Sequence, residues 1–178
     1  MIIGIVGTLG AGKGTVVEYL KQQGFSHYSA SGYLREVIES EGGTPNRESY
    51  SALATKIRQA DEAGLAKILY TRAEQDGVKD AIIEALHDEG EAEYVKKSGG
   101  ILLGIDVAPK IRYARQQARG SEKDDVTFEE FLVQIAREEE GEGHHNIHGA
   151  LKMTDHIIMN DGTIEDLYEK VEEWLQTL

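Results

Sequence analysis

Residues 7–15, GTLGAGKGT, have the residue types and spacing of a loop that holds phosphate groups. Glycines allow the backbone to curl so that several N–H groups point inward at phosphate oxygens. A helix that begins near Lys13 adds its positive N-terminal end, and the lysine can reach the β and γ phosphates of a nucleotide. Thr15 or a neighbouring backbone group can support a Mg²⁺ ion that keeps several waters. The loop therefore predicts a site for ATP and Mg²⁺.

The spacing of this loop differs from the usual phosphate-loop pattern by one residue. That pattern places Ser or Thr directly after the lysine, whereas here Gly14 intervenes before Thr15. A dinucleotide-binding loop is the weaker alternative, because the glycines do not make the G-x-G-x-x-G spacing and Lys13 would have no role there. The strand, the glycine spacing, the lysine and the helix together also argue against a turn that merely joins two elements.

The elements around the loop follow a regular alternation. The apolar run Ile2–Val6 is typical of a strand buried on both faces of a parallel sheet. Strands are expected at residues 2–6, 25–29, 80–86, 101–107 and 156–160. Helices are expected after residue 13, at 33–39, 44–60, 65–73, 92–97, 109–119 and 127–140, and after residue 163. This alternation predicts an α/β fold with a parallel sheet of about five strands, covered by helices on both faces.

Several helix starts have a local signature. Pro45 is expected at an early helical position, where its missing N–H costs nothing. Thr127 and Glu130 form a capping-box pattern, and Thr163 opens a similar start near the end of the chain. Residues 141–149 are rich in glycine and histidine and are expected to form a loop.

Composition bounds the class of protein. The chain has 178 residues, 40% of them hydrophobic, which suits one domain over residues 1–178. The formal net charge of −13 disfavours nucleic-acid binding and a membrane-surface role. There is no cysteine, so disulfides and cysteine-ligated zinc are excluded. No stretch looks like a signal peptide or a membrane span, and we expect a soluble cytoplasmic protein.

Three segments resemble known kinases. The loop GTLGAGKGT looks like the phosphate loop of adenylate kinases and related nucleoside monophosphate kinases. Residues 29–36, SASGYLRE, resemble the S-T-G-D-x-[LF]-R segment of the same enzymes. Residues 153–175 resemble the ending of dephospho-CoA kinases and of adenylate-kinase-related proteins. The resemblance implies a three-layer P-loop kinase fold with strand order 2-3-1-4-5, a helical acceptor-binding insertion at 33–79 and a lid region at 120–150.

The resemblance also assigns site residues. The donor triphosphate would be held by Gly7, Thr8, Leu9, Gly10, Ala11, Gly12, Lys13, Gly14 and Thr15. Asn160 and Gly162 would lie beside the base of the donor, largely through main-chain contacts. The acceptor would contact Ser31, Arg35 and His87. Catalysis would use Lys13 with two lid arginines, Arg119 and Arg137.

For the metal, the resemblance implies Thr15 and Glu84, with Glu84 holding a Mg²⁺-bound water. Asp106, which ends the apolar run ILLGID, resembles a Walker B aspartate and is the reserve ligand. The order of these carboxylates around Mg²⁺ stays open at the level of sequence.

The chain departs from the kinase pattern on the acceptor side. Gly32 stands where the relatives have Asp, and His87 stands where they often have Arg. Glu84 replaces an Asp of the D-G-x-[PR]-R segment. A histidine weakens the acceptor-phosphate clamp, so these departures imply a different acceptor or diminished catalysis.

Other charged residues have plain alternatives. Arg112 and Arg115 share a helix face with Arg119, and a solvated basic face explains the first two equally well. Arg137 lies beside Glu138–Glu140, where a surface ion pair is the alternative to a lid role. The run that contains His144, His145 and His148 suggests a metal site, because His144 and His148 are four positions apart and could share a metal on a helix. Without a third clear ligand beside that pair, a solvent-exposed loop is favoured.

The expected function is transfer of the γ-phosphoryl of ATP to a nucleoside or deoxynucleoside monophosphate or a similar small acceptor. A dephospho-CoA kinase activity is one alternative. A nucleotide-dependent switch or NTPase without a small-molecule acceptor is another, because the weakened acceptor motif leaves room for ATP-driven ordering of the lids.

Overall fold

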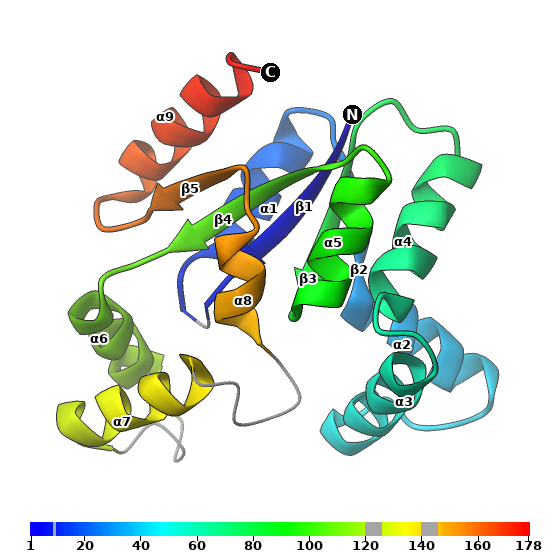
Figure 1. The fold of residues 1–178 in the computed structure, drawn as a ribbon, viewed down its shortest axis with the longest axis horizontal. Helices are drawn as coiled ribbons and strands as arrows, with labels where there is room; N and C mark the ends of the chain where they lie inside the picture. The colour runs from blue at the N-terminus through cyan, green and yellow to red at the C-terminus, as the bar shows by residue number, and fades with distance from the viewer. Residues whose placement is uncertain (9, 120–125, 140–145) are drawn as a thin grey trace.

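The computed structural model describes residues 1–8, 10–119, 126–139 and 146–178. Its centre is one parallel sheet of five strands in the order β2-β3-β1-β4-β5 (Figure 1). The strands are β1 (Ile2–Gly7), β2 (Ser26–Ser29), β3 (Ala81–Leu86), β4 (Ile101–Asp106) and β5 (His156–Met159). The predicted fold class and strand order are therefore confirmed.

Helices within the described residues connect and flank these strands. They are α1 (Lys13–Gln22), α2 (Ala30–Ser40), α3 (Arg47–Ala60), α4 (Gly64–Gln75), α5 (Glu89–Lys97), α6 (Pro109–Arg119), α7 (Phe128–Glu139), α8 (Ile147–Lys152) and α9 (Ile164–Leu175). None of the helices in this described part has both the length and the apolar character needed to span a bilayer.

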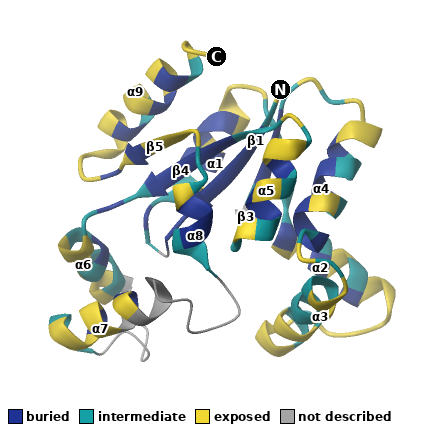
Figure 2. Ribbon diagram, viewed as in Figure 1, coloured by how far each residue is buried: buried dark blue, intermediate teal, exposed yellow. Residues whose placement is uncertain are grey.

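Two apolar cores lie on opposite faces of the sheet. Side chains alternate along a strand, so Ile3 and Ile5 of β1 pack toward α1 and α9, while Val6 packs toward α4, α5 and α8. Leu102 and Leu103 of β4 divide between the two cores in the same way. Because both faces are covered, most residues of the central strands β1 and β4 are buried, and these strands appear largely dark in Figure 2.

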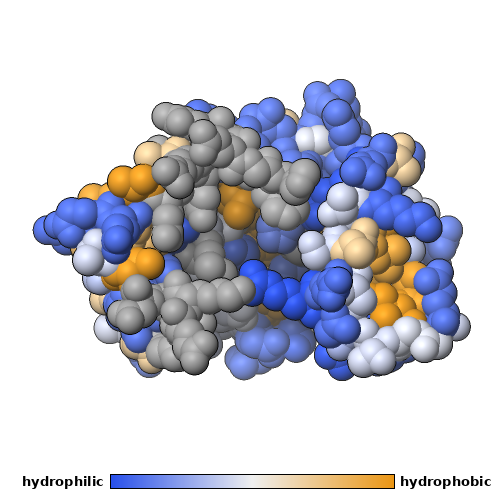
Figure 3. Space-filling model, turned by 90° about the horizontal axis from the view of Figure 1, so that it is seen from below, coloured by the Kyte–Doolittle hydropathy of each residue, from blue (hydrophilic) through white to orange (hydrophobic). Residues whose placement is uncertain are grey.

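Two helical lobes flank the carboxyl ends of the strands. Figure 1 shows α6 and α7 below the sheet on one side and α2 and α3 on the other, with the loop after β1 between them. Figure 3 looks onto this end and shows the surface hollowed between the lobes. Ligands of open α/β sheets bind at the carboxyl ends of strands, so this is where a site is expected.

Some expected boundaries are wrong. Pro45 lies before α3, which begins at Arg47 behind an Asn46 N-cap, because the Asn46 and Ser49 side chains form a capping box. The segment 141–149 is not all loop, since α8 begins at Ile147. Its N-cap is Asn146, whose side chain accepts from the N–H of Gly149. A helix of six residues such as α8 is too short to show a recognisable periodicity.

Other helix starts agree with the local signatures. Thr127 and Glu130 exchange side-chain and backbone hydrogen bonds at the start of α7, and Thr163 forms a capping box with Asp166 at the start of α9. Helix α2 begins at Ala30 rather than residue 33, because the Ser29 hydroxyl accepts from the N–H of Gly32. Of the proposed lid region, residues 120–125 and 140–145 lie outside the described part of the chain.

Candidate active site

The loop after β1 adopts the curled backbone that the glycine spacing predicts. Gly10 and Gly12 have φ angles of 83° and 100°, a conformation that favours glycine. A Cβ on Gly7 would lie 2.4 Å from the backbone oxygen of Ile105 in the neighbouring strand β4. Gly14 differs, because a Cβ there would meet nothing within 4 Å. Leu9 of the predicted loop lies outside the described residues.

The loop is held from the far end of the chain. The buried side-chain amide of Asn160 donates to the backbone oxygen of Ala11 at 2.8 Å. Arg115 of α6 donates to the backbone oxygens of Asn160, at 3.0 Å, and of Gly10, at 3.4 Å. A Cβ on Gly12 would lie 2.3 Å from the Asn160 amide nitrogen, so this residue must be small. Arg115 is thus part of the loop's support rather than of a solvated basic face.

Lys13 lies folded over its own loop. Its ammonium donates to the backbone oxygens of Gly7 and, at 3.0 Å, of Thr8. Burial lowers the pKa of Lys13, the nearby carboxylate of Glu84 opposes that shift, and Arg112 adds to it. The ammonium is therefore a partly desolvated donor bonded to neutral backbone oxygens, and the charged oxygens of a phosphate would make stronger hydrogen bonds to it.

Two carboxylates flank the loop from neighbouring strands. Asp106, at the end of β4, accepts from the Thr8 hydroxyl at 3.3 Å and from the N–H of Val107 at 2.8 Å. Glu84 of β3 lies on the other side of β1 and meets His27 Nε2 at 2.7 Å. The hydrogen bond to His27 lowers the pKa of Glu84 against the opposing effect of burial, so its carboxylate is ionised.

These oxygens suit Mg²⁺, which takes few protein ligands and completes its shell with substrate phosphates and waters. Thr15 and Glu84, the two predicted metal residues, line different cavities, while Asp106 is bonded to the loop itself. The donor set of hydroxyl and carboxylate oxygens fits the ion. Within the described part of the chain, no group of three or more His, Cys, Asp or Glu side chains could form a metal cage alone.

A cavity of about 230 Å³ lies on the α9 side of the loop. It is lined by Gly10, Gly12, Thr15, Arg115, Asn160, Gly162, Thr163, Ile164 and Leu167. The structure thus brings Asn160 and Gly162, which were predicted beside the donor base, together with the predicted phosphate loop. We call this the donor-side cavity.

A second cavity, of about 420 Å³, lies on the other side of Lys13. It is lined by Lys13, Ser29, Ala30, Ser31, Leu34, Tyr50, Ser51, Ala54, Arg58, Leu65, Glu84 and His87. Ser31 and His87 were predicted as acceptor contacts. Arg35 does not line this cavity, but its Nε donates to the hydroxyl of Tyr50, which is a lining residue. We call this the acceptor-side cavity.

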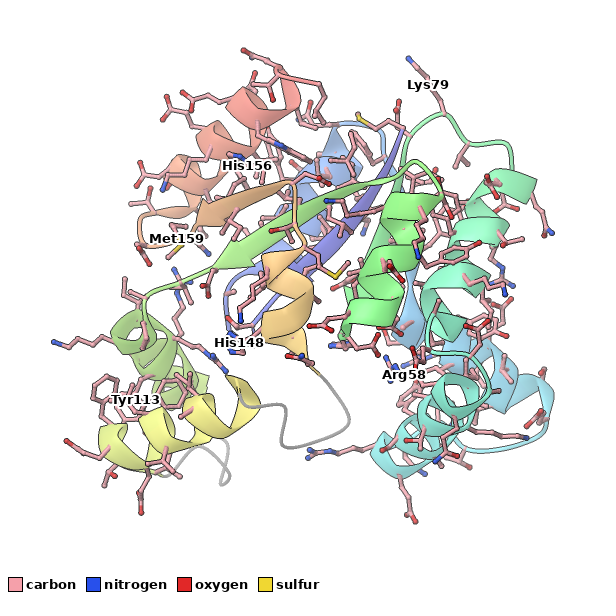
Figure 4. All side chains as sticks on the ribbon, viewed as in Figure 1. Arg58, Lys79, Tyr113, His148, His156 and Met159 are labelled. Atoms are coloured by element: carbon pink, nitrogen blue, oxygen red, sulfur yellow. The ribbon has the colours of Figure 1, made fainter. Side chains whose placement is uncertain are left out.

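Arg58 is a residue of this cavity that the sequence analysis missed. Its Nε donates to Glu91 at 3.1 Å and lies 3.6 Å from Asp88, between α3 and the start of α5 (Figure 4). Glu91 is completely buried and also accepts from the N–H of His87 at 2.8 Å. No pattern in a polar helix such as α3 distinguishes Arg58 from its exposed neighbours, so only the tertiary fold reveals it.

The other lobe is built around aromatic residues. Arg112, weighed earlier as a solvated residue, is buried, with its guanidinium 5.4 Å from the Phe131 ring centroid. Tyr113 packs on Phe131 and Phe128 of α7 (Figure 4). The face of α6 that carries Arg112 and Arg115 therefore packs against the protein, whereas the spacing of the arginines was equally consistent with a solvent-exposed basic face.

Several predicted residues cannot be placed. Arg119 ends α6 and Arg137 lies in α7, but the side chains of both are outside the described part of the structure. His144 and His145 fall in the undescribed segment 140–145, whereas His148 lies on α8. The two lid arginines remain predictions.

Comparison with known proteins places the chain in a family. A family model described as "AAA domain" matches residues 3–143. A UPF0200 protein of Sulfurisphaera tokodaii is 30% identical over 179 residues, covering 99% of this chain and 97% of the relative. A UPF0200 protein of Pyrococcus horikoshii is 28% identical, covering 97% of this chain and 95% of the relative.

Solved structures show a shared fold. Shikimate kinase from Acinetobacter baumannii in complex with shikimate is similar with a TM-score of 0.62 and 18% identity, covering 99% of this chain and 93% of that one. Dephospho-CoA kinase from Campylobacter jejuni is similar with a TM-score of 0.57 and 14% identity, covering 99% and 96%. The chain therefore belongs to the AAA-domain family of that model and to the UPF0200 proteins, and it has the fold of P-loop kinases.

Proposed function

We propose that the protein transfers the γ-phosphoryl group of ATP to a nucleoside or deoxynucleoside monophosphate or a similar small anionic acceptor. The observation that carries this proposal is that one loop serves two cavities. Gly10, Gly12 and Thr15 line the donor-side cavity, while Lys13 lines the acceptor-side cavity. A γ-phosphate held on the loop would therefore face a second bound molecule, which is the arrangement a kinase needs.

The chemistry rests on positioning and charge. An acceptor oxygen attacks the γ-phosphorus, the bond to the β,γ-bridging oxygen breaks, and ADP leaves with that electron pair. Lys13 stabilises charge on the transferring group, together with the loop N–H groups and, in the proposal, Arg119 and Arg137. Bound Mg²⁺ would supply further neutralisation of the phosphates, with Thr15 and Glu84 or Asp106 as the protein oxygens beside it.

The hydrogen bonds of the loop serve this chemistry before any ligand arrives. Asn160 and Arg115 donate to the backbone oxygens of Ala11 and Gly10, and the N–H of Ala11 donates to the backbone oxygen of Thr8 at 3.2 Å, so the shape of the loop is fixed from within and from outside. Donors that are already oriented cost no reorganisation during the reaction.

The test is a panel of acceptors with the purified protein and Mg-ATP. AMP, other nucleoside and deoxynucleoside monophosphates and dephospho-CoA are compared by coupled detection of ADP, with product phosphorylation checked by mass. We expect one acceptor to raise ADP formation well above the acceptor-free rate. Equal slow ADP release with every acceptor would reject the kinase proposal.

A dephospho-CoA kinase activity is the second acceptor assignment, favoured by the resemblance of residues 153–175 to the ending of those enzymes. The same panel decides between the two. A nucleotide-dependent switch is the alternative of another class, and it would be indicated by tight ATP binding without acceptor-dependent turnover.

A further inference from the structure

The acceptor-side cavity is lined by a largely buried arginine, Arg58, that the kinase resemblance does not predict. The kinases that the sequence resembles often have an arginine at the position where this chain has His87. Arg58 reaches the same cavity from helix α3, whereas His87 lies in the short connection between β3 and α5. The Arg58 side chain is only 13% exposed, so it is held inside the protein rather than in solvent.

The contacts of Arg58 fix the orientation of its guanidinium. Among the described residues, its recorded partners, Glu91 and Asp88, both meet the Nε atom. The terminal nitrogens of the planar fork are therefore available to a ligand, and such forks match the oxygens of a phosphate or carboxylate. Glu91 also accepts from the backbone N–H of His87, so the backbone at position 87 helps to position Arg58 through Glu91.

The rest of the cavity is suited to an anion. Lys13 lines its inner side, and the N-terminus of α2 reaches it through Ser29, Ala30 and Ser31. A helix N-terminus presents unpaired N–H groups and positive potential. Glu84 is the lining carboxylate, and it is already paired with His27.

We propose that Arg58 binds the anionic group of the acceptor and thereby replaces the arginine absent at position 87. This inference rests on the proposed phosphotransferase function, because it assigns the acceptor-side cavity to the acceptor. The recognised chemistry is a compact oxyanion, either a phosphate monoester or a carboxylate. Arg58 is then a specificity-determining residue, and Glu91 is the residue that positions it.

The variants must separate binding from folding. Arg58→Gln alone would leave Glu91 buried without its cation, which is strongly destabilising. The main variant is therefore Arg58→Gln combined with Glu91→Gln, compared with Glu91→Gln alone. Lys56→Gln, an exposed charge loss on the same helix, is the matched control.

Binding is measured by calorimetry on the full chain with a Mg-bound, non-hydrolysable ATP analogue filling the donor side. The probes are AMP and inorganic phosphate for phosphate chemistry and shikimate for carboxylate chemistry. We expect the double variant to bind the recognised probe about 10- to 100-fold more weakly than Glu91→Gln, the effect of losing a hydrogen-bonded charge. Lys56→Gln should bind it like the parent protein, and all variants should bind the ATP analogue equally.

Each outcome has a distinct meaning. Selective loss of AMP and phosphate binding identifies a phosphate acceptor, and selective loss of shikimate binding identifies a carboxylate acceptor; both support the proposal. Equal affinity in the single and double variants, or a parent protein that binds no probe, overturns it. Arg58-dependent binding without phosphoryl transfer would reject the proposed function alone, whereas transfer with an acceptor KM indifferent to Arg58 would reject this inference alone.

Discussion

The donor side and the acceptor side of Lys13 are built in different ways. The phosphate loop is a run of consecutive residues between β1 and α1, and its shape follows from glycine conformations at Gly10 and Gly12. The acceptor-side cavity collects residues from the loop, α2, α3, α4 and β3. A site made of consecutive residues can be recognised from spacing, whereas a site assembled from separate elements cannot.

The difference extends to how charge is held. On the donor side, backbone groups and two supporting side chains, Asn160 and Arg115, define the loop. On the acceptor side, the cation Arg58 depends on the buried carboxylate of Glu91. Backbone N–H groups are neutral dipoles that do not titrate, whereas a buried carboxyl group does, so the two sides should respond differently to mutation and to pH.

The largest expected effect is on the donor side. Lys13→Ala should reduce phosphoryl transfer by about 100- to 1000-fold, as loss of one oriented charge-stabilising donor does. ATP affinity should fall as well, because the ammonium also contacts the ground-state phosphates. Steady-state kinetics and nucleotide titration measure the two effects, and normal ATP affinity in this variant would contradict the assignment of the loop.

The next effect concerns pH and the acceptor side. Burial raises the pKa of Glu91 from 4.5 to about 7, against the opposing effect of Arg58. The folded protein therefore binds this proton more tightly than the unfolded chain does. This contribution to stability is complete below about pH 4.5 and is lost as pH rises through 7.

Glu91→Gln removes the titrating group, so comparing this variant with the parent protein isolates the contribution of Glu91 to the pH dependence of the unfolding free energy. The difference in unfolding free energy between the variant and the parent protein should change by on the order of 3 kcal/mol between pH 4.5 and pH 7. Other carboxylates, such as Glu84 with its lowered pKa, act in the opposite direction but cancel in this difference. Urea denaturation over that pH range measures it, and a difference independent of pH would show that Glu91 keeps an ordinary pKa.

A pair of glycine variants tests the geometry of the loop. Gly12→Ala should lower the unfolding free energy by about 1–3 kcal/mol, because position 12 has a positive φ and its Cβ would press on Asn160. Gly14→Ala is the control, since its Cβ would enter open space at the start of α1. Thermal denaturation compares them. Equal losses in both variants would mean that the loop is not held against Asn160.

The last prediction concerns Asn160, the side chain that supports the loop, and its expected effect is no larger than that of Gly12→Ala. Asn160→Ala leaves the backbone oxygen of Ala11 without its buried donor, at a cost of about 1–3 kcal/mol in unfolding free energy. We expect the ATP affinity to fall in parallel, because the loop loses a hydrogen bond that orients it. Stability lost with unchanged nucleotide affinity would assign Asn160 to the core alone.

Sequence alone could predict the sheet because its signals are local. Continuous apolar runs such as Ile2–Val6 and 101–107 are typical of strands whose two faces are both buried. The strand order was predicted separately, from the resemblance to kinases. Helix starts with a capping box, such as Thr127, were predictable because that signal is local too. The start of α3 was not, because Pro45 suggested a helical position that the Asn46 cap takes over.

Residues close together along the chain were enough to predict the phosphate loop, its glycines and the parallel sheet, because each depends on backbone conformation or on alternation between near neighbours. The packing of separate elements was needed to show that Asn160 donates to Ala11, that Arg115 supports the loop and that Arg58 lines the acceptor-side cavity. Asn160 and Ala11 are separated by 149 positions, and Arg115 and Gly10 by 105. Arg58 is separated by 33 positions from Glu91, the residue that holds it in place. A side chain's partner across such a separation is set by the packing of whole elements, and no spacing along the chain encodes it.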